Sequence, residues 1–226
     1  MNLARGLVLL HEHDEATQIL KRLQRETPND VNVLEAVGRC LLQQGQAEES
    51  RRVLVKLLEV SPKHAMGRLL LARVHLEERD YPEALRFLKE LADERRFDIE
   101  VRYSFALALQ SMGDTRRAAE EFQFVTSARE AIARARQMAD IVMAKEPQNA
   151  DLRYQIGVIL LKYESPEAGA GWLRSVLEFD PDHRLAHRAL AEYYEQRDFT
   201  KLARTHRERL NALGSPDTNR PEPQRK

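Results

Sequence analysis

Histidine clusters are the residues with the clearest potential for chemistry, because imidazole and carboxylate groups bind zinc. His11-Glu12-His13-Asp14 is a continuous run of such groups, and His183 and His187 lie four positions apart. A zinc site requires three or four ligands at defined spacings, supported by further hydrogen bonds. Neither cluster has that set. We interpret the first as a polar turn and the second as a helix start with exposed imidazoles, and we predict no metal site.

The sequence motifs of common enzyme active sites are absent. No P-loop, Gly-x-Ser-x-Gly or His-Glu-x-x-His sequence occurs. Gly169-Ala170-Gly171 lies inside a helical pattern and follows no strand, so it lacks the context of a phosphate-binding loop. Cys40 is the single cysteine and lies in an apolar stretch, so we expect it to be buried and unreactive. We therefore predict no catalytic residue, no cofactor and no enzyme activity.

The composition favours a helical, soluble protein. Of the 226 residues, 32% are charged and 6% are aromatic, and the formal net charge is +0. A nucleic-acid-binding protein normally carries a basic surplus, so this balance argues against nucleic acid as a partner. No apolar run approaches the roughly 18 residues of a membrane span. The compartment is not indicated: cytoplasmic if the chain is complete, and open if an N-terminal segment precedes it.

The chain repeats a unit whose first complete copy is 31–64. Small residues recur 34 positions apart at Gly38, Ala72 and Ala106, and again at Gly157 and Ala191. A glycine inside a helix costs about 1 kcal/mol relative to alanine, so we expect a neighbouring helix to approach closely there. Three further columns follow in the second helix of each unit: Ser50, Ala84, Ala118, Gly169 and Ala203; Leu54, Leu88, Phe122 and Leu173; Leu57, Leu91, Val125, Val176 and Leu210.

These columns resemble the tetratricopeptide repeat, which has a 34-residue period, small residues in both helices and a closing proline. Pro62 and Pro181 stand at that closing position, whereas Arg96 replaces it in one unit. The family's leading tryptophan is replaced by Leu34, Arg68, Arg102, Arg153 and His187. The resemblance covers about 1–213. It implies an all-α fold, an α-solenoid of antiparallel helix pairs stacked into a right-handed superhelix with a concave groove.

The period predicts one superhelical domain over 1–213 and a disordered tail over 214–226. The domain would comprise a partial repeat 1–30, repeats 31–64, 65–98 and 99–127, an extra helix 128–149, and repeats 150–183 and 184–213. The extra helix is expected because the spacing from Ala106 to Gly157 is one and a half units. No Gly or Pro lies between Thr115 and Glu146, so one long helix is an alternative. Ser127 and Glu130 form a capping-box pattern, however, and we predict a helix break near Ser127. The odd helix either shifts the superhelix axis or divides the protein into two sub-arrays.

The outward residues of the first helices are the predicted binding site, because these helices line the groove in the family. By register they are Arg39, Leu69, Arg73, Tyr103, Leu107, Tyr154, Val158, Lys162 and Arg188. Tyrosine and arginine are frequent interface anchors. For Tyr103 and Tyr154 the alternative is packing between neighbouring helices. The family's Lys-and-Asn pattern for a peptide carboxylate is not reproduced, which favours an apolar or mixed-charge segment as the ligand.

We therefore predict a non-catalytic scaffold that binds a peptide segment or a partner protein in the concave groove. The alternative is an accessory repeat region of a larger enzyme or membrane-anchored protein. That alternative arises because the first repeat begins within its first helix, as if an N-terminal part were missing from this chain. A homodimer formed through the open N-terminal end, where Leu7, Leu9 and Leu10 lie, is a further hypothesis.

Overall fold

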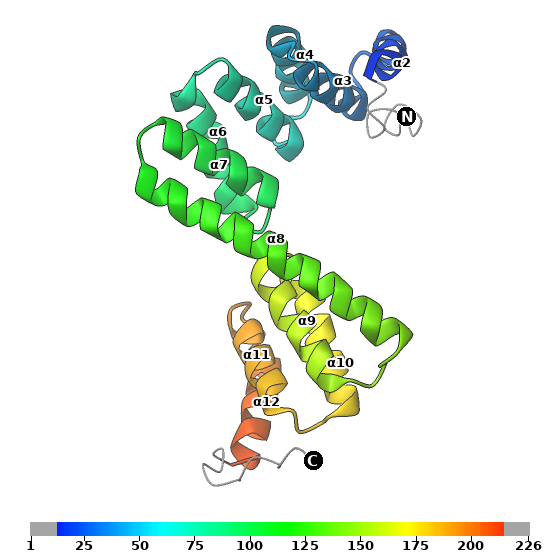
Figure 1. The fold of residues 1–226 in the computed structure, drawn as a ribbon, viewed down its shortest axis with the longest axis vertical. Coiled ribbons are helices and arrows are strands. Elements are labelled where there is room, and N and C mark those ends of the chain that lie inside the picture. Colours follow the sequence, from blue (N-terminus) through cyan, green and yellow to red (C-terminus); the bar gives the residue numbers. More distant parts are fainter. Residues whose placement is uncertain (1–12, 215–226) are drawn as a thin grey trace. The chain divides into compact units, whose positions relative to one another are not determined.

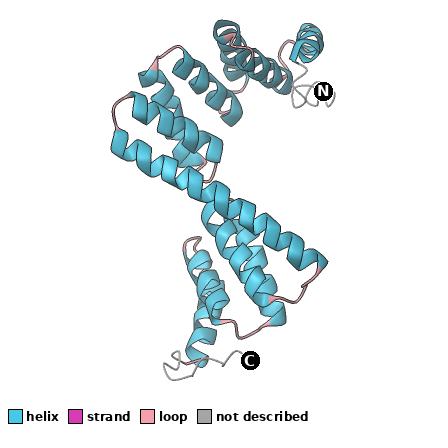
Figure 2. Cartoon of the chain, viewed as in Figure 1, coloured by secondary structure: helices cyan, strands magenta, loops and turns pink. Residues whose placement is uncertain are grey.

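Paired antiparallel helices make up nearly all of the structure (Figures 1 and 2). The computed structural model describes residues 13–214, and this part of the chain contains eleven α-helices and no β-strand. The predicted all-α solenoid of antiparallel helix pairs is confirmed. The chain divides into two compact units between Thr126 and Ser127.

The first unit is built from helix pairs whose first helices contact one another. Its helices are α2 (His13–Glu26), α3 (Val31–Gln43), α4 (Ala47–Val60), α5 (Ala65–Glu77), α6 (Tyr81–Glu94), α7 (Ile99–Ser111) and the beginning of α8 (Thr115–Ala144). Helix α3 pairs with α4 and α5 with α6, while α3 contacts α5 and α5 contacts α7. The interior is dominated by leucine, and Cys40 is buried there as expected.

The second unit repeats the same arrangement. It contains the rest of α8, then α9 (Ala150–Tyr163), α10 (Pro166–Phe179), α11 (Arg184–Glu195) and α12 (Thr200–Ala212). Helix α9 pairs with α10, and α11 pairs with α12. Leu173 and Leu190 form part of one core cluster, and Val142 of α8 packs with Ile156 of α9 in another.

Helix α8 runs without interruption for 30 residues, so the predicted break near Ser127 is wrong. Inside a continuous helix the backbone N–H groups near Ser127 bond to carbonyls one turn earlier, and they need no capping box. What changes near Ser127 is the packing partner. Ala118 belongs to the core that α5, α6 and α7 share, whereas Val142 packs against α9. The extra helix of the sequence pattern is therefore the continuation of the helix before it.

Each first helix from α3 onward begins at a residue whose side chain accepts backbone N–H bonds. These N-caps are Asp30, His64, Asp98, Asn149 and His183. They recur 34 positions apart, from Asp30 to Asp98 in the first unit and from Asn149 to His183 in the second. This column is additional to the small and apolar columns of the sequence analysis. A cap satisfies donors that have no partner within the helix and contributes about 1 kcal/mol. The 34-residue period thus fixes where helices begin as well as where they touch.

The central small residues lie where the two helices of a pair meet, as predicted. A Cβ atom added to Gly38 would lie 2.6 Å from Cδ2 of Leu54, and one added to Gly157 would lie 2.8 Å from Cγ of Leu173. Ser50 of α4 makes use of this approach, since its hydroxyl donates to the carbonyl of Gly38 at 2.7 Å. An added methyl group in α3 or α9 would therefore force the facing leucine to shift.

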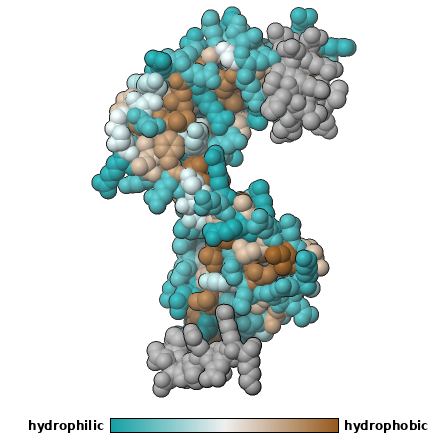
Figure 3. Space-filling view, in the orientation of Figure 1, coloured by the Kyte–Doolittle hydropathy of each residue, from teal (hydrophilic) through white to brown (hydrophobic). Residues whose placement is uncertain are grey.

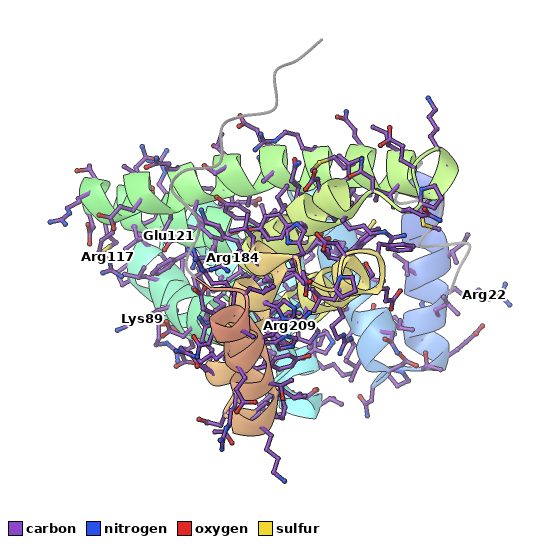
Figure 4. All side chains as sticks on the ribbon, turned by 90° about the horizontal axis from the view of Figure 1, so that it is seen from below. Arg22, Lys89, Arg117, Glu121, Arg184 and Arg209 are labelled. Carbon is purple, nitrogen blue, oxygen red and sulfur yellow. The ribbon has the colours of Figure 1, made fainter. Side chains whose placement is uncertain are left out.

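In α7, α9 and α11 basic side chains stand at the position of the family's tryptophan and tie the helix to the turn before it. Arg102 Nε donates to the backbone carbonyl six residues earlier at 2.6 Å, and Arg153 Nε donates to the corresponding carbonyl at 2.9 Å. His187 Nε2 lies 2.9 Å from the equivalent carbonyl in the last repeat. Arg102 also reaches its own second helix, where Nη1 lies 2.5 Å from Oε2 of Glu121 (labelled in Figure 4). Hydrogen bonds and ion pairs therefore hold these helices in place, where the family pattern has apolar packing by tryptophan.

Candidate functional site

The first helices α5 and α7 of the first unit present a partly apolar face. Tyr103 of α7 is 38% exposed, and its ring stands edge-on to Phe122 with the centroids 5.7 Å apart. Leu107 follows one turn later and is half-buried. Figure 3 shows apolar surface over the region of α5 to α7. Tyr103 therefore packs against a neighbouring helix and still offers an exposed edge.

One charged side chain bridges the two helices of this face, and a further charged pair lies on α3. Arg73 of α5 bridges to α7, where its Nε donates to the Ser104 hydroxyl and its Nη2 to Oε2 of Glu100, both at 3.2 Å. Arg39 of α3 donates to Glu35 at 2.7 Å within its own helix. Both guanidinium groups are partly exposed and held in position by these bonds. The face thus combines an aromatic edge with charges of both signs.

Leu69 does not belong to this face. It is 1% exposed and lies in the core with Leu88 and Leu91, so the prediction that it faces the groove is wrong. Leu69 and Tyr103 occupy equivalent positions at the edge of the apolar stripe. A leucine there can turn wholly inward, whereas the polar tip of a tyrosine keeps one edge of the ring at the surface.

In the second unit, two of the predicted residues line a pocket of about 390 Å³ between α8 and α9. Helix α9 contributes Tyr154, Gln155, Val158 and Ile159. Helix α8 contributes Arg134, Gln137, Met138 and Ile141. The sequence reading missed the α8 residues, although the one-and-a-half-unit spacing was the signal that could have revealed them. Lys162 and Arg188 are exposed elsewhere on α9 and α11, and the ammonium group of Lys162 lies 4.7 Å from the Tyr163 ring.

The histidines of the last repeat are packed inside it. His183 caps α11 through Nδ1, which accepts from Ala186 N at 3.1 Å, and its ring lies 5.1 Å from that of Tyr154. His187 is buried, and its Nδ1 lies 2.8 Å from Nδ1 of His206 on α12. Burial and the neighbouring His187 lower the pKa of His206. The expected exposed imidazoles are therefore wrong, because α9 and α12 cover them.

Within residues 13–214, no three His, Cys, Asp or Glu side chains are grouped so as to hold a metal ion. His11 and Glu12 of the first histidine cluster lie outside the described residues, as do Leu7, Leu9 and Leu10. Across the same described range, no helix combines the length and apolar character needed to cross a membrane.

Comparison with known proteins identifies the repeat. Residues 41–108 match the family model described as tetratricopeptide repeat, which confirms the resemblance for these residues. A comparison with curated proteins found no match. Tetratricopeptide repeats form scaffolds for protein interactions.

Similar solved structures span most of the chain. One is MamA (41-end) from Desulfovibrio magneticus RS-1, which is 19% identical, with 94% of this chain and 91% of that chain covered and a TM-score of 0.45. Another, described as MamA, is 13% identical, covers 94% and 95%, and has a TM-score of 0.47. YrrB, described as a TPR protein with an unusual peptide-binding site, is 16% identical, covers 88% and 93%, and has a TM-score of 0.43.

Proposed function

We propose that this chain, whose residues 41–108 are tetratricopeptide repeats, is a non-catalytic scaffold that binds a segment of a partner protein. The binding surface of the first unit is the face of α5 and α7. The observation that carries the proposal is the exposed edge of Tyr103, one turn from Leu107 on α7, the helix to which Arg73 bridges. Aromatic and arginine side chains in fixed positions are those that most often dominate binding energy.

The chemistry of this face indicates which segments it fits. Tyr103 and Leu107 offer apolar contact. Arg73 with Glu100, and Arg39 with Glu35, present both signs of charge. A partner segment with one bulky apolar side chain flanked by charged groups would match this arrangement.

Peptide selection tests the proposal. A random peptide library displayed on phage is selected against the full chain, and the recovered peptides are titrated against variants. We expect Tyr103→Ala to weaken binding at least tenfold, as the loss of an anchor residue does. Val55→Ala is the control, because Val55 is an exposed apolar residue on the second helix α4. Circular dichroism establishes that both variants remain folded.

One result would contradict the proposal. If peptides are recovered and bind Tyr103→Ala and Arg73→Ala as tightly as the unchanged chain, the face of α5 and α7 is not the binding surface. A library that yields no peptide above background for any chain would contradict it equally.

A further inference from the structure

The half repeat at the centre of the chain leaves one second helix without a first helix of its own. Three residues of α8 lie 34 positions before the second-helix columns of α10 (Gly169, Leu173 and Val176): Ala135, Ala139 and Val142. In α6 the same columns hold Ala84, Leu88 and Leu91. In a complete repeat a first helix precedes this segment and packs against it. Here the preceding residues are the earlier part of α8, which is already the second helix of the repeat before.

Complete repeats show which positions the first helix covers. These positions lie three and six residues after the small residue of the second helix. In one repeat, His75 of α5 stacks on Phe87 of α6 with the centroids 6.0 Å apart. In the next, Arg102 of α7 lies 2.5 Å from Glu121 and 4.1 Å from the centre of the Phe124 ring, both on α8.

In the half repeat the same two positions are Met138 and Ile141. Both line the pocket between α8 and α9, and Ile141 is 38% exposed. In complete repeats the first helix contacts this position even where its side chain is polar and exposed, as Arg68 does Glu90 at 3.7 Å. An exposed branched apolar side chain at the same position, with no first helix to contact it, marks a surface from which an element is missing. Figure 3 shows apolar surface on this part of the second unit.

Helix α9 is open on the side that faces this pocket. In α5 and α7 the positions two before and two after the central small residue are buried under the preceding repeat: Leu70, Val74, Ser104 and Ala108. In α9 these positions are Gln155, which is exposed, and Ile159, which is half-buried. Two neighbouring helices thus leave open the very faces that one first helix would cover.

We infer that an amphipathic helix of a partner protein docks in this pocket, in the place of the missing first helix. The first helices α3, α5 and α7 are each 13 residues long, so we expect the docked helix to have about that length. Apolar residues spaced at i, i+4 and i+7 would contact Met138, Ile141 and Ile159. Arg134 is the single charged side chain of the pocket lining, so the helix carries an acidic residue facing it.

The pocket suits a partner helix better than a second copy of this chain. Helices α5, α7 and α9 carry arginine in the column that contacts these two positions, namely Arg68, Arg102 and Arg153. The column's other members, Leu34 of α3 and His187 of α11, are buried within their own repeats. In the pocket such an arginine would meet Met138 and Ile141 and would find no carboxylate, and burying an unpaired charge is costly. The partner helix has an apolar residue there instead. The inference rests on the proposed scaffold function but uses a surface in the other unit.

The experiment selects helical peptides of 13 to 20 residues from a phage-displayed library against the full chain, and titrates labelled peptides by fluorescence anisotropy. Ile141→Asp is expected to weaken binding at least tenfold. The matched control is Met143→Asp, two residues further along α8, where the side chain is 77% exposed and outside the pocket lining; it is expected to change affinity less than twofold. Arg134→Glu is expected to weaken binding a few-fold, and replacing the peptide's acidic residue by lysine restores it.

The outcomes separate this inference from the proposed function. Peptides that lose affinity with Tyr103→Ala but not with Ile141→Asp or Arg134→Glu overturn the inference and leave the α5 and α7 face standing. Peptides that depend on Ile141 alone support the inference and count against that face. If the purified chain is a dimer that Ile141→Asp dissociates in sedimentation experiments, a second copy fills the pocket and the inference of a partner helix is overturned.

Discussion

Two glycines of α10 are expected to respond in opposite directions to replacement by alanine. A Cβ added to Gly169 would lie 2.5 Å from the backbone nitrogen of Leu161 and 2.6 Å from the carbonyl oxygen of Gly157, both on α9. A Cβ added to Gly171 would meet nothing nearer than Nη2 of Arg174, at 4.0 Å. The two sites share a helix, a sequence neighbourhood and the same chemical change. They differ only in what the new methyl group contacts.

The magnitudes follow from this difference. Ordinary contacts of a Cβ begin at about 3.4 Å, so α9 and α10 would have to separate by roughly 0.9 Å at Gly169, the difference between 3.4 and 2.5 Å. Overpacking costs about 1–3 kcal/mol, and the upper end applies because the clashing atoms are backbone. Alanine returns about 1 kcal/mol of helix propensity. Gly169→Ala is thus destabilising by about 2 kcal/mol, and Gly171→Ala is stabilising by up to about 1 kcal/mol.

The assay is urea denaturation followed by tryptophan fluorescence. Trp172 is the single tryptophan of the chain and lies in α10, so its signal reports the second unit. Thermal unfolding followed by the same fluorescence gives a second measurement, in which a difference of about 3 kcal/mol corresponds to roughly 6–12 °C in melting temperature for a chain of this size. If Gly169→Ala proves as stable as Gly171→Ala, the close approach of α9 and α10 does not hold, and the packing explanation of the glycine column fails.

Three further predictions concern the polar contacts. Arg102→Leu should lower the free energy of unfolding by about 1–3 kcal/mol, because the Arg102 side chain is only 21% exposed and its carboxylate partner on α8 would be left unpaired. The control is Arg116→Leu, since the Arg116 side chain is 89% exposed; it should leave the urea midpoint followed by circular dichroism unchanged. Equal effects of the two substitutions would contradict the reasoning. Ser50→Ala should cost about 1 kcal/mol in the same assay, because it removes the buried hydrogen bond to the Gly38 carbonyl, and an unchanged midpoint would speak against that bond. The lowered pKa of His206 means that the unfolded chain binds this proton more readily than the folded chain does. The stability due to neutral His206 is therefore complete above its ordinary pKa of 6.5 and is lost as the pH falls through the lower folded-state pKa. The urea midpoint measured by tryptophan fluorescence should decrease once the pH is lowered below about 6.5; His206→Gln should make this decrease shallower, and equally steep profiles would exclude His206 as the cause.

Much of the fold was predictable because it is repeated. A small residue at Gly38 means little alone, but the same character at Ala72 and Ala106 places the same helix contact three times. The 34-residue spacing of the N-caps supplies a second, independent frame for the helix starts. Residues that share a column share an environment, so one correct assignment carries over to every unit.

The errors fall where a residue's environment is not set by its column. Ser127 carries a capping-box pattern, yet α8 continues through it because helical carbonyls already satisfy the local N–H groups. Leu69 and Tyr103 share a column but differ in exposure, because only the tyrosine has a polar tip to keep at the surface. His187 was assigned to the surface because its partner, His206, lies 19 residues away on another helix.

The sequence by itself determined the helix pairs and the half-unit interruption, though not the continuity of α8 through Ser127, because period and residue size act locally and recur. Only the tertiary structure decided that the interruption leaves a pocket between α8 and α9, and which side chains line it. The physical reason is that a pocket forms where side chains lack a packing partner, and a sequence column does not show whether that partner is present. Met138, Ile141 and Ile159 look like ordinary core residues in the sequence, and they are left open because the helix that would cover them is not there.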